Sequence, residues 1–183
     1  REPIQVSNDL QKNKEQIVRL MGDSLDIKAR GFQLVVKHGG SIEALMVSVD
    51  GLVDEAAIRL NALRPLMEYT FNAQSDLFAQ IRQHIYLKEI EETSDLYAAV
   101  IQMIKGSVLL FVDGFGKVIV IHTESFELRS IEEPPTEAVV KGPREGFVEA
   151  LPTNLTLLRR RIQHPALRFE SVTIGEISNS DVI

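Results

Sequence analysis

The sequence predicts an α/β protein made of two small subdomains, each with a mixed sheet flanked by helices. Its 183 residues are 44% hydrophobic and 25% charged, which is the composition of a folded globular chain with a sizeable core. Two β-hairpin patterns alternate with stretches of helical periodicity in the first two thirds of the chain. An acidic stretch with two adjacent prolines then separates these elements from a further strand, helix and strand.

The chain begins with a predicted helix over residues 8–21. The hydroxyl of Ser7 can accept a hydrogen bond from a backbone N–H of the first turn, so we place the N-cap at this residue. Apolar residues then recur at helical spacing, at Leu10, Ile17 and Met21. These positions predict one buried face on the helix.

A hairpin is predicted next, over residues 32–49, because apolar residues alternate on both sides of Gly39 and Gly40. The second strand of this hairpin has apolar residues on both of its faces, which are Ile42, Ala44 and Met46 on one face and Leu45, Val47 and Val49 on the other. A strand that is covered on both faces is expected to lie in the centre of a sheet.

Three helices and a second hairpin complete the predicted first subdomain. The first of these helices has an apolar stripe, and Pro65 is expected to end or bend it; the stripe is Val53, Ala56, Ala57, Leu60 and Leu63. Further helices are predicted around residues 77–85 and 96–104, with Gly106 closing the second of them. Residues 108–121 then predict a hairpin whose first strand is fully buried.

We place the subdomain boundary in the acidic stretch. The first subdomain is expected to span residues 1–128, and residues 138–183 are expected to form the start of the second, which looks incomplete. Residues 129–137 form the linker between them, because the prolines at 134 and 135 make this acidic stretch stiff.

The second subdomain is expected to contain a strand at 138–140, a helix that ends at Ile162 and a strand around 169–174. The helix carries an apolar stripe made of Phe147, Leu151, Leu155, Leu158 and Ile162. Pro152 removes one helical hydrogen bond, so we expect a kink or a restart of the helix near Leu151.

Charge and composition argue against several classes of function. The chain has a net charge of −6 and lacks the excess of basic residues that binds a phosphate backbone, so no nucleic acid is expected as a partner. The chain has no cysteine, which excludes a disulfide and a thiolate nucleophile in these residues. Its apolar runs are far shorter than the roughly 20 residues of a membrane-spanning helix.

No metal site is predicted, because the four histidines are widely separated; they are His38, His84, His122 and His164. No nucleophile, base and orienting group can be named together, so we predict no catalytic residue, no cofactor and no enzyme.

A turn between the predicted strand at 138–140 and the following helix is the first candidate for a ligand site. Backbone N–H groups at the start of a helix and the guanidinium of Arg144 could hold an anion there. The candidate residues are Gly142, Arg144, Glu145 and Gly146. A tight turn that is capped by Glu145 in the first helical turn explains the same residues.

Arg159, Arg160 and Arg161 form the second candidate, at the end of the predicted helix. Cations at this position complement the negative end of the helix dipole. Three successive arginines point in different directions around a helix, so at least one can reach a carboxylate on a partner surface or in the linker, which ends at Glu137. Asn154 begins a glycosylation sequon, which we interpret as coincidental on a helix, and we keep Asn154 only as an interface candidate.

The run from residue 130 to 162 resembles the block that is typical of A subunits of bacterial spore germinant receptors. The block starts with the pattern SIEEP-x-TE, has GPREGF-x-E at its centre and ends with N-x-x-x-x-RRRI. Weaker similarity to the same family covers VDGLVDEAAIRLNALRPLM at 49–67 and GSVLLFVDG at 106–114, so the resemblance extends over nearly the whole chain.

This resemblance implies a module of two α/β subdomains that precedes a membrane-spanning region outside these residues. The receptor would contain B and C subunits as partners, lie in the inner membrane of the dormant spore and respond to nutrients, with this domain on the cytoplasmic (core) side. The leading hypothesis is therefore a signalling and assembly domain that contacts the other subunits or forms a homo-oligomer. The alternative is that the domain itself binds a small nutrient, at the 142–146 turn or between the subdomains.

Overall fold

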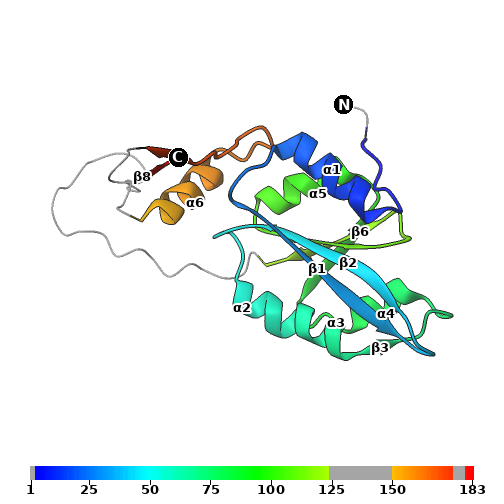
Figure 1. The fold of residues 1–183 in the computed structure, drawn as a ribbon. Coiled ribbons are helices and arrows are strands. Elements are labelled where there is room, and N and C mark those ends of the chain that lie inside the picture. Colours follow the sequence, from blue (N-terminus) through cyan, green and yellow to red (C-terminus); the bar gives the residue numbers. More distant parts are fainter. Residues whose placement is uncertain (1–2, 124–149, 175–179) are drawn as a thin grey trace.

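The computed structural model describes residues 3–123, 150–174 and 180–183. Its centre is a six-stranded mixed sheet with strand order β3-β1-β2-β5-β6-β4, which lies between two layers of helices (Figure 1). The strands of this sheet are β1 Ile27–Val36, β2 Ser41–Val49, β3 Thr70–Phe71, β4 Glu89–Thr93, β5 Val108–Val112 and β6 Val118–His122. All neighbouring strands are antiparallel except β1 and β3, so the predicted α/β class with mixed sheets is confirmed.

The helix α1 Leu10–Met21 starts two residues later than predicted, and Asp9 is its N-cap instead of Ser7. The Asp9 carboxylate accepts hydrogen bonds from the backbone N–H groups of residues 11 and 12. The hydroxyl of Ser7 instead accepts from the backbone N–H of Asp9. An ionised carboxylate is a stronger acceptor than a hydroxyl at the positive end of the helix, which explains why the cap lies at Asp9.

The first hairpin is confirmed, and β2 occupies the predicted central position between β1 and β5. The turn that joins β1 to β2 contains three successive residues with positive φ, which are His38, Gly39 and Gly40. Glycine adopts this backbone conformation without a steric penalty, so the glycine pair allows the tight reversal.

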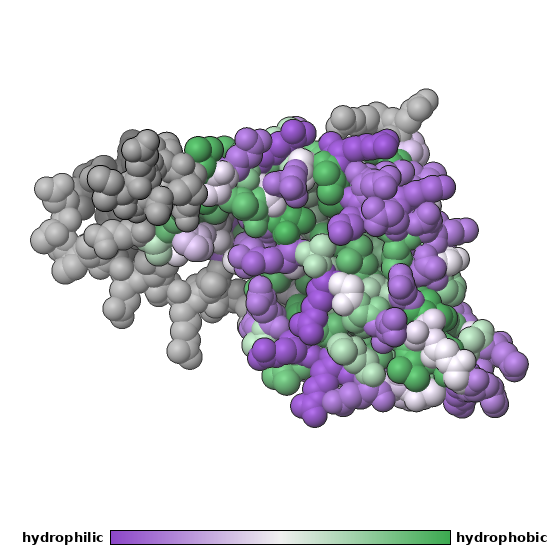
Figure 2. All heavy atoms as spheres, viewed as in Figure 1, coloured by the Kyte–Doolittle hydropathy of each residue, from purple (hydrophilic) through white to green (hydrophobic). Residues whose placement is uncertain are grey.

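The sheet separates two apolar clusters. The lower cluster in Figure 1 lies between the sheet and the helices α2 Glu55–Ile58, α3 Arg64–Glu68 and α4 Leu77–Gln83. The upper cluster lies under α1 and α5 Leu96–Ile104. The outer side of α1 is hydrophilic (Figure 2), as expected for a helix that covers a sheet from the solvent side.

The helical run from Glu55 continues to Glu68, so of the two predicted outcomes at Pro65, an end or a bend of the helix, the end is not observed. Between α2 and α3 the run adopts a π-helical turn, η1 Arg59–Leu63, in which the N–H of Arg64 bonds to the carbonyl of Arg59. An α-helix would need the missing N–H of Pro65 to reach the carbonyl of Asn61. That carbonyl accepts instead from the backbone N–H of Tyr86 at 2.7 Å, so it does not lack a partner.

The strands β3 and β4 were not predicted from the sequence. The strand β3 has only two residues, which is too short for any alternation to appear. The strand β4 has the sequence EIEET and lies at the edge of the sheet, where only one of its residues contributes to a core cluster. By contrast, α5 and the buried hairpin β5–β6 are confirmed, and Gly106 follows α5 with a φ of 112°.

The second predicted subdomain is described only in part. Its helix α6 spans Leu151–Arg161 with Pro152 in the first turn, so a helix does begin where a kink or restart was expected. A small antiparallel sheet follows, made of β7 Val172–Ile174 and β8 Ser180–Val182. The predicted strand at 138–140 and the linker at 129–137 lie outside the described residues. No helix among the described residues is long and apolar enough to cross a membrane.

Candidate functional site: a buried arginine beside an open pocket

The side chain of Arg159, on α6, is completely buried. Its Nε and Nη2 atoms donate hydrogen bonds to the two carboxylate oxygens of Asp26, at 2.8 and 2.9 Å. Its Nη1 atom donates to the backbone carbonyl of Leu167 at 2.9 Å, and the guanidinium lies over the ring of Phe169, 5.0 Å from the ring centre. The arginine therefore joins three segments, which are α6, the chain just before β1 and the chain that follows α6.

Ser24 completes this polar cluster. Its hydroxyl donates to Asp26 at 2.6 Å and accepts from the backbone N–H of Phe169 at 2.9 Å. Ser24 and Asp26 are themselves 5% exposed, so the whole cluster is shielded from water. Paired and fully hydrogen-bonded charges tolerate burial, whereas removing one member leaves the other uncompensated at a cost of about 3–5 kcal/mol.

The predicted apolar stripe of α6 is not the face that the structure buries. The buried residues of this helix are Leu157 and Arg159, whereas Leu151 and Ile162 are 36% and 46% exposed. The polar cluster explains the difference, because the helix turns its arginine toward Asp26. Sequence periodicity could not reveal this, since it counts arginine as a solvent-facing residue.

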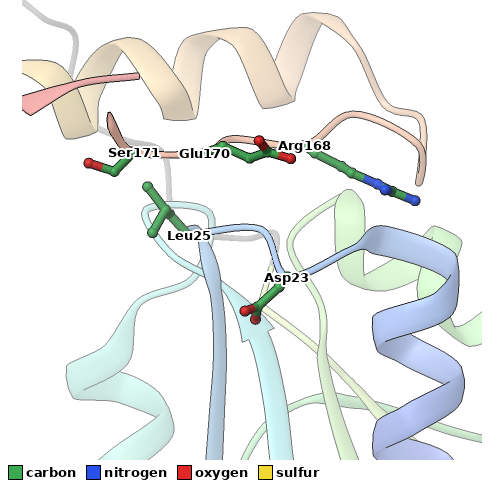
Figure 3. Close-up of a pocket in the computed structure, with 5 residues that line it drawn as sticks. All are labelled: Asp23, Leu25, Arg168, Glu170 and Ser171. Atoms are coloured by element: carbon green, nitrogen blue, oxygen red, sulfur yellow. The ribbon is translucent and has the colours of Figure 1, made fainter. Parts of the chain in front are cut away.

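An open pocket of about 290 Å³ lies next to the buried cluster, lined by Asp23, Leu25, Arg168, Glu170 and Ser171 (Figure 3). Asp23 and Leu25 alternate with the buried Ser24 and Asp26, and Arg168 and Glu170 lie on either side of the buried Phe169. The two segments are joined by the hydrogen bond from the N–H of Leu25 to the carbonyl of Phe169. The buried side chains of the two segments thus supply or contact the ion pair, and the exposed side chains line the pocket.

The pocket combines both signs of charge with an apolar wall. Asp23 and Glu170 supply carboxylates, Arg168 supplies a guanidinium, and the half-exposed Leu25 supplies an apolar surface. Gly22 leaves room for the Arg168 stem, because an added Cβ at Gly22 would lie only 2.6 Å from the Arg168 side chain. This chemistry suits a small molecule that carries both an ammonium and a carboxylate group.

Among the candidate residues that the structure describes, only Arg159 takes part in the hydrogen bonds of the buried cluster. Arg160 and Asn154 are partly buried on α6, and Arg161 is exposed. Glu137 and the turn residues Gly142, Arg144, Glu145 and Gly146 lie outside the described residues. Sequence reasoning identified Arg159 as one of three candidates but missed Asp26, Ser24 and the pocket residues.

A further polar group involves the residue before β5, the last residue of β6 and a residue of β4. The hydroxyl of Ser107 lies 3.0 Å from Nδ1 of His122, whose Nε2 is 3.6 Å from the carboxylate of Glu91. This order of side chains resembles that of a hydrolase, but Ser107 is completely buried, so a substrate cannot reach its hydroxyl. No group of three or more metal-ligating side chains is found within the described ranges.

Comparison with known proteins places this arrangement in a family. The family model described as "Bacillus/Clostridium GerA spore germination protein" matches residues 15–183. The chain belongs to the GerA spore germination family. This membership accounts for the motifs between residues 130 and 162, and the predicted resemblance to A subunits of germinant receptors is confirmed.

Individual proteins are similar to this chain over nearly its whole length. Spore germination protein KA of Bacillus subtilis (strain 168) is 28% identical over 98% of this chain. The uncharacterized membrane protein YfkQ of the same organism is also 28% identical, over 97% of the chain. The matched parts are 33% and 34% of those two proteins, so the chain spans about a third of the length of these relatives.

A solved structure supports the GerA fold. The N-terminal domain of the A subunit of the Bacillus megaterium spore germinant receptor GerK3 superposes with a TM-score of 0.75 at 26% identity. The match covers 99% of this chain and 65% of that domain. The fold of this chain therefore matches that of the N-terminal domain of the GerK3 A subunit.

Proposed function

We propose that this chain acts as a non-catalytic signalling and assembly domain of a membrane-bound germinant receptor. The proposal places it on the cytoplasmic side of the spore inner membrane, in contact with B and C subunits of the receptor. The family membership supports a role in germination, and the likeness to the N-terminal domain of the GerK3 A subunit supports the position in an A subunit.

The observation that carries the signalling role is the buried ion pair between Arg159 and Asp26. It fixes α6 to the segment before β1 through a two-pronged contact that is costly to break. A domain that relays a signal between subunits needs such stiff connections, because a loose joint would absorb the movement instead of transmitting it.

The experiment compares two variants in spores whose receptor A subunit contains this chain. Arg159→Lys keeps the charge but loses the planar fork that matches the carboxylate. We expect normal A-subunit levels by immunoblot, reduced co-purification of the B and C subunits and a slower response to nutrient. Arg160→Lys is the matched control and should leave all three measurements unchanged. An equal response of both variants to nutrient, at normal protein levels, would contradict the proposal.

The pocket favours a second candidate function, which is direct binding of a small zwitterionic nutrient such as an amino acid. Its carboxylates could bind the ammonium group of the nutrient, and Arg168 the carboxylate. NMR titration of the chain with amino acids should then shift the amide signals of residues 23–26 and 168–171. Arg168→Ala should abolish these shifts, whereas Arg160→Ala should preserve them. The absence of any shift at millimolar ligand would exclude this function.

A further inference from the structure

The two edges of the six-stranded sheet carry opposite charges. Along β1, the side chains of Lys28 and Arg30 are exposed, and β3 covers this edge only at Val35 and Val36. Along β4, at the other end of the strand order, Glu89 and Glu91 are exposed. The basic β1 edge therefore repels the β1 edge of a second copy and attracts its acidic β4 edge.

The register of the sheet shows which backbone groups are free at the β1 edge. The N–H of Val36 bonds to the carbonyl of Gly40, its partner across the hairpin, so the even-numbered residues of β1 bond to β2. The backbone groups of the odd-numbered residues, including Ala29 and Gly31, therefore point away from the sheet. Within the described residues, neither Ala29 nor Gly31 makes a backbone hydrogen bond outside the sheet.

The free backbone groups at the β4 edge follow from the registers of β5 and β6. The N–H of Asp113 bonds to the carbonyl of Glu43, which shows that the odd-numbered residues of the β5 strand face β2. The even-numbered residues of β5 therefore bond to the odd-numbered residues of β6, which leaves the even-numbered residues of β6 to bond to the odd-numbered residues of β4. The backbone groups of Ile90 and Glu92 thus point outward, and in the described part of the chain neither residue makes a backbone hydrogen bond outside the sheet.

The charged side chains of the two edges lie on opposite faces of the sheet. Lys28 and Arg30 alternate in step with Phe32, which belongs to the lower cluster. Ile90 also packs against the lower cluster. Its neighbours Glu89 and Glu91 point to the other side of the strand, so they lie on the upper face. They can meet the basic residues of a second copy only if that copy is turned over about an axis that runs across the strands.

Turning the second copy over also reverses its strand direction. Within one sheet β1 and β4 run in the same direction, so the reversed copy presents its β1 antiparallel to β4, which is the more favourable pairing. One register then satisfies both requirements. Ala29 lies opposite Ile90 as a hydrogen-bonded pair, and it is flanked by Lys28 opposite Glu91 and by Arg30 opposite Glu89.

We propose that the free edge of β1 binds the β4 edge of a second copy of this chain, antiparallel and in this register. The contact is head-to-tail, because each copy uses a different edge for each neighbour. This inference rests on the proposed assembly role and names the surface through which copies associate. Lys28 and Glu91 already contact Asp50 and His122, but both contacts are exposed on at least one side, so giving them up costs little free energy.

The natural absence of cysteine allows a direct test by disulfide formation between two variants. In the proposed register Gly31 lies opposite Lys88. Both residues are exposed, and neither belongs to the two proposed ion pairs between the edges. A Cβ at Gly31 would come no closer than 4.0 Å to a neighbouring atom, so cysteine is tolerated there. We expect a mixture of Gly31→Cys and Lys88→Cys chains to give a mixed disulfide dimer under mild oxidation.

The controls distinguish this arrangement from other contacts. Lys14→Cys, exposed on α1, should give no more than background dimer with Lys88→Cys. Adding Arg30→Glu to the Gly31→Cys chain should lower the yield about two- to fivefold, and adding Glu89→Arg to the Lys88→Cys chain should restore it. A mixed dimer at background level would overturn the proposal, and so would a predominance of Gly31→Cys homodimer or an absence of any charge effect.

The outcome can be separated from that of the receptor proposal. Cross-linking of the purified chain tests only the contact between edges, whereas the Arg159→Lys spores test the signalling role. Spores with Arg30→Glu should germinate slowly and recover with Glu89→Arg if the edge contact forms in the receptor. A normal response in Arg30→Glu spores, together with a defect in Arg159→Lys spores, would refute the edge contact alone.

Discussion

The six-stranded sheet and the α6 segment are held in place by different forces. The sheet is stabilised by two apolar clusters spread over many residues, such as Leu110 on one face and Phe111 on the other, each completely buried. Neither cluster contains a described residue of α6 or of the chain that follows it. The described contacts of the α6 segment include the buried polar cluster of Arg159, Asp26 and Ser24 and the packing of Thr156 against Gly51. Loss of one buried charge is therefore expected to affect this segment more than loss of one apolar residue affects the sheet.

The largest effect is expected from breaking the polar attachment. Arg159→Met should lower the free energy of unfolding by about 3–5 kcal/mol, because the buried carboxylate of Asp26 loses its counter-charge. Asp26→Asn should be destabilising for the complementary reason. The double variant should lose less than the sum of the two, as measured by urea denaturation in a double-mutant cycle.

Hydrogen exchange locates the damage caused by Arg159→Met. We expect the amides of α6 to lose more protection than the fall in global stability explains. The amides of β5 and β6 should lose no more protection than that fall. Uniform loss of protection in both regions would show that the sheet depends on α6, and would contradict the separate attachment of the two regions.

A smaller effect is expected at the contact between α6 and the turn after β2. Gly51 has a φ of 74°, and an added Cβ would collide with the side chain of Thr156 on α6. Gly51→Ala should therefore cost about 1–3 kcal/mol, from backbone strain and the collision together. Gly39→Ala is the matched control, because its φ of 81° gives similar strain but nothing lies within 4 Å of the added Cβ. Equal losses of stability in thermal unfolding would exclude a role for the Thr156 contact.

The smallest effect is expected at the neighbour of the buried arginine. Arg160→Ala should change the free energy of unfolding by no more than about 0.5 kcal/mol, since Arg160 lies outside the buried cluster. The contrast with Arg159 is measured on the same denaturation assay. A loss above about 2 kcal/mol for Arg160→Ala would show that the arginine run acts as one unit.

Much of the sheet could be predicted, because its local patterns match its environment. The central place of β2 followed from apolar residues on both faces, and the end of α5 followed from Gly106. The edge strand β4 was missed because three of its five residues are glutamates, which give no apolar alternation. The sequence left open whether the helix ends or bends at Pro65, because its continuity depends on a carbonyl that bonds to the distant Tyr86.

The candidate site could be predicted only in part. The position of Arg159 at the end of a helix suggested a carboxylate partner, but the sequence placed that partner in the linker or on another subunit. The observed partner, Asp26, is 133 residues away, and no local period connects the two positions. The pocket residues Asp23 and Arg168 were missed for the same reason, since each is an ordinary charged residue until the two segments meet.

The separation of Arg159 and Asp26 has a consequence for synthesis of the chain on the ribosome. At roughly 5–20 residues per second, translation takes about 7–27 s to cover the 133 residues between them. During this interval the Asp26 carboxylate stays hydrated, and β1 to β6 can assemble without it. Docking of α6 is then the last step in this part of the nascent protein, and it dehydrates both charges at once.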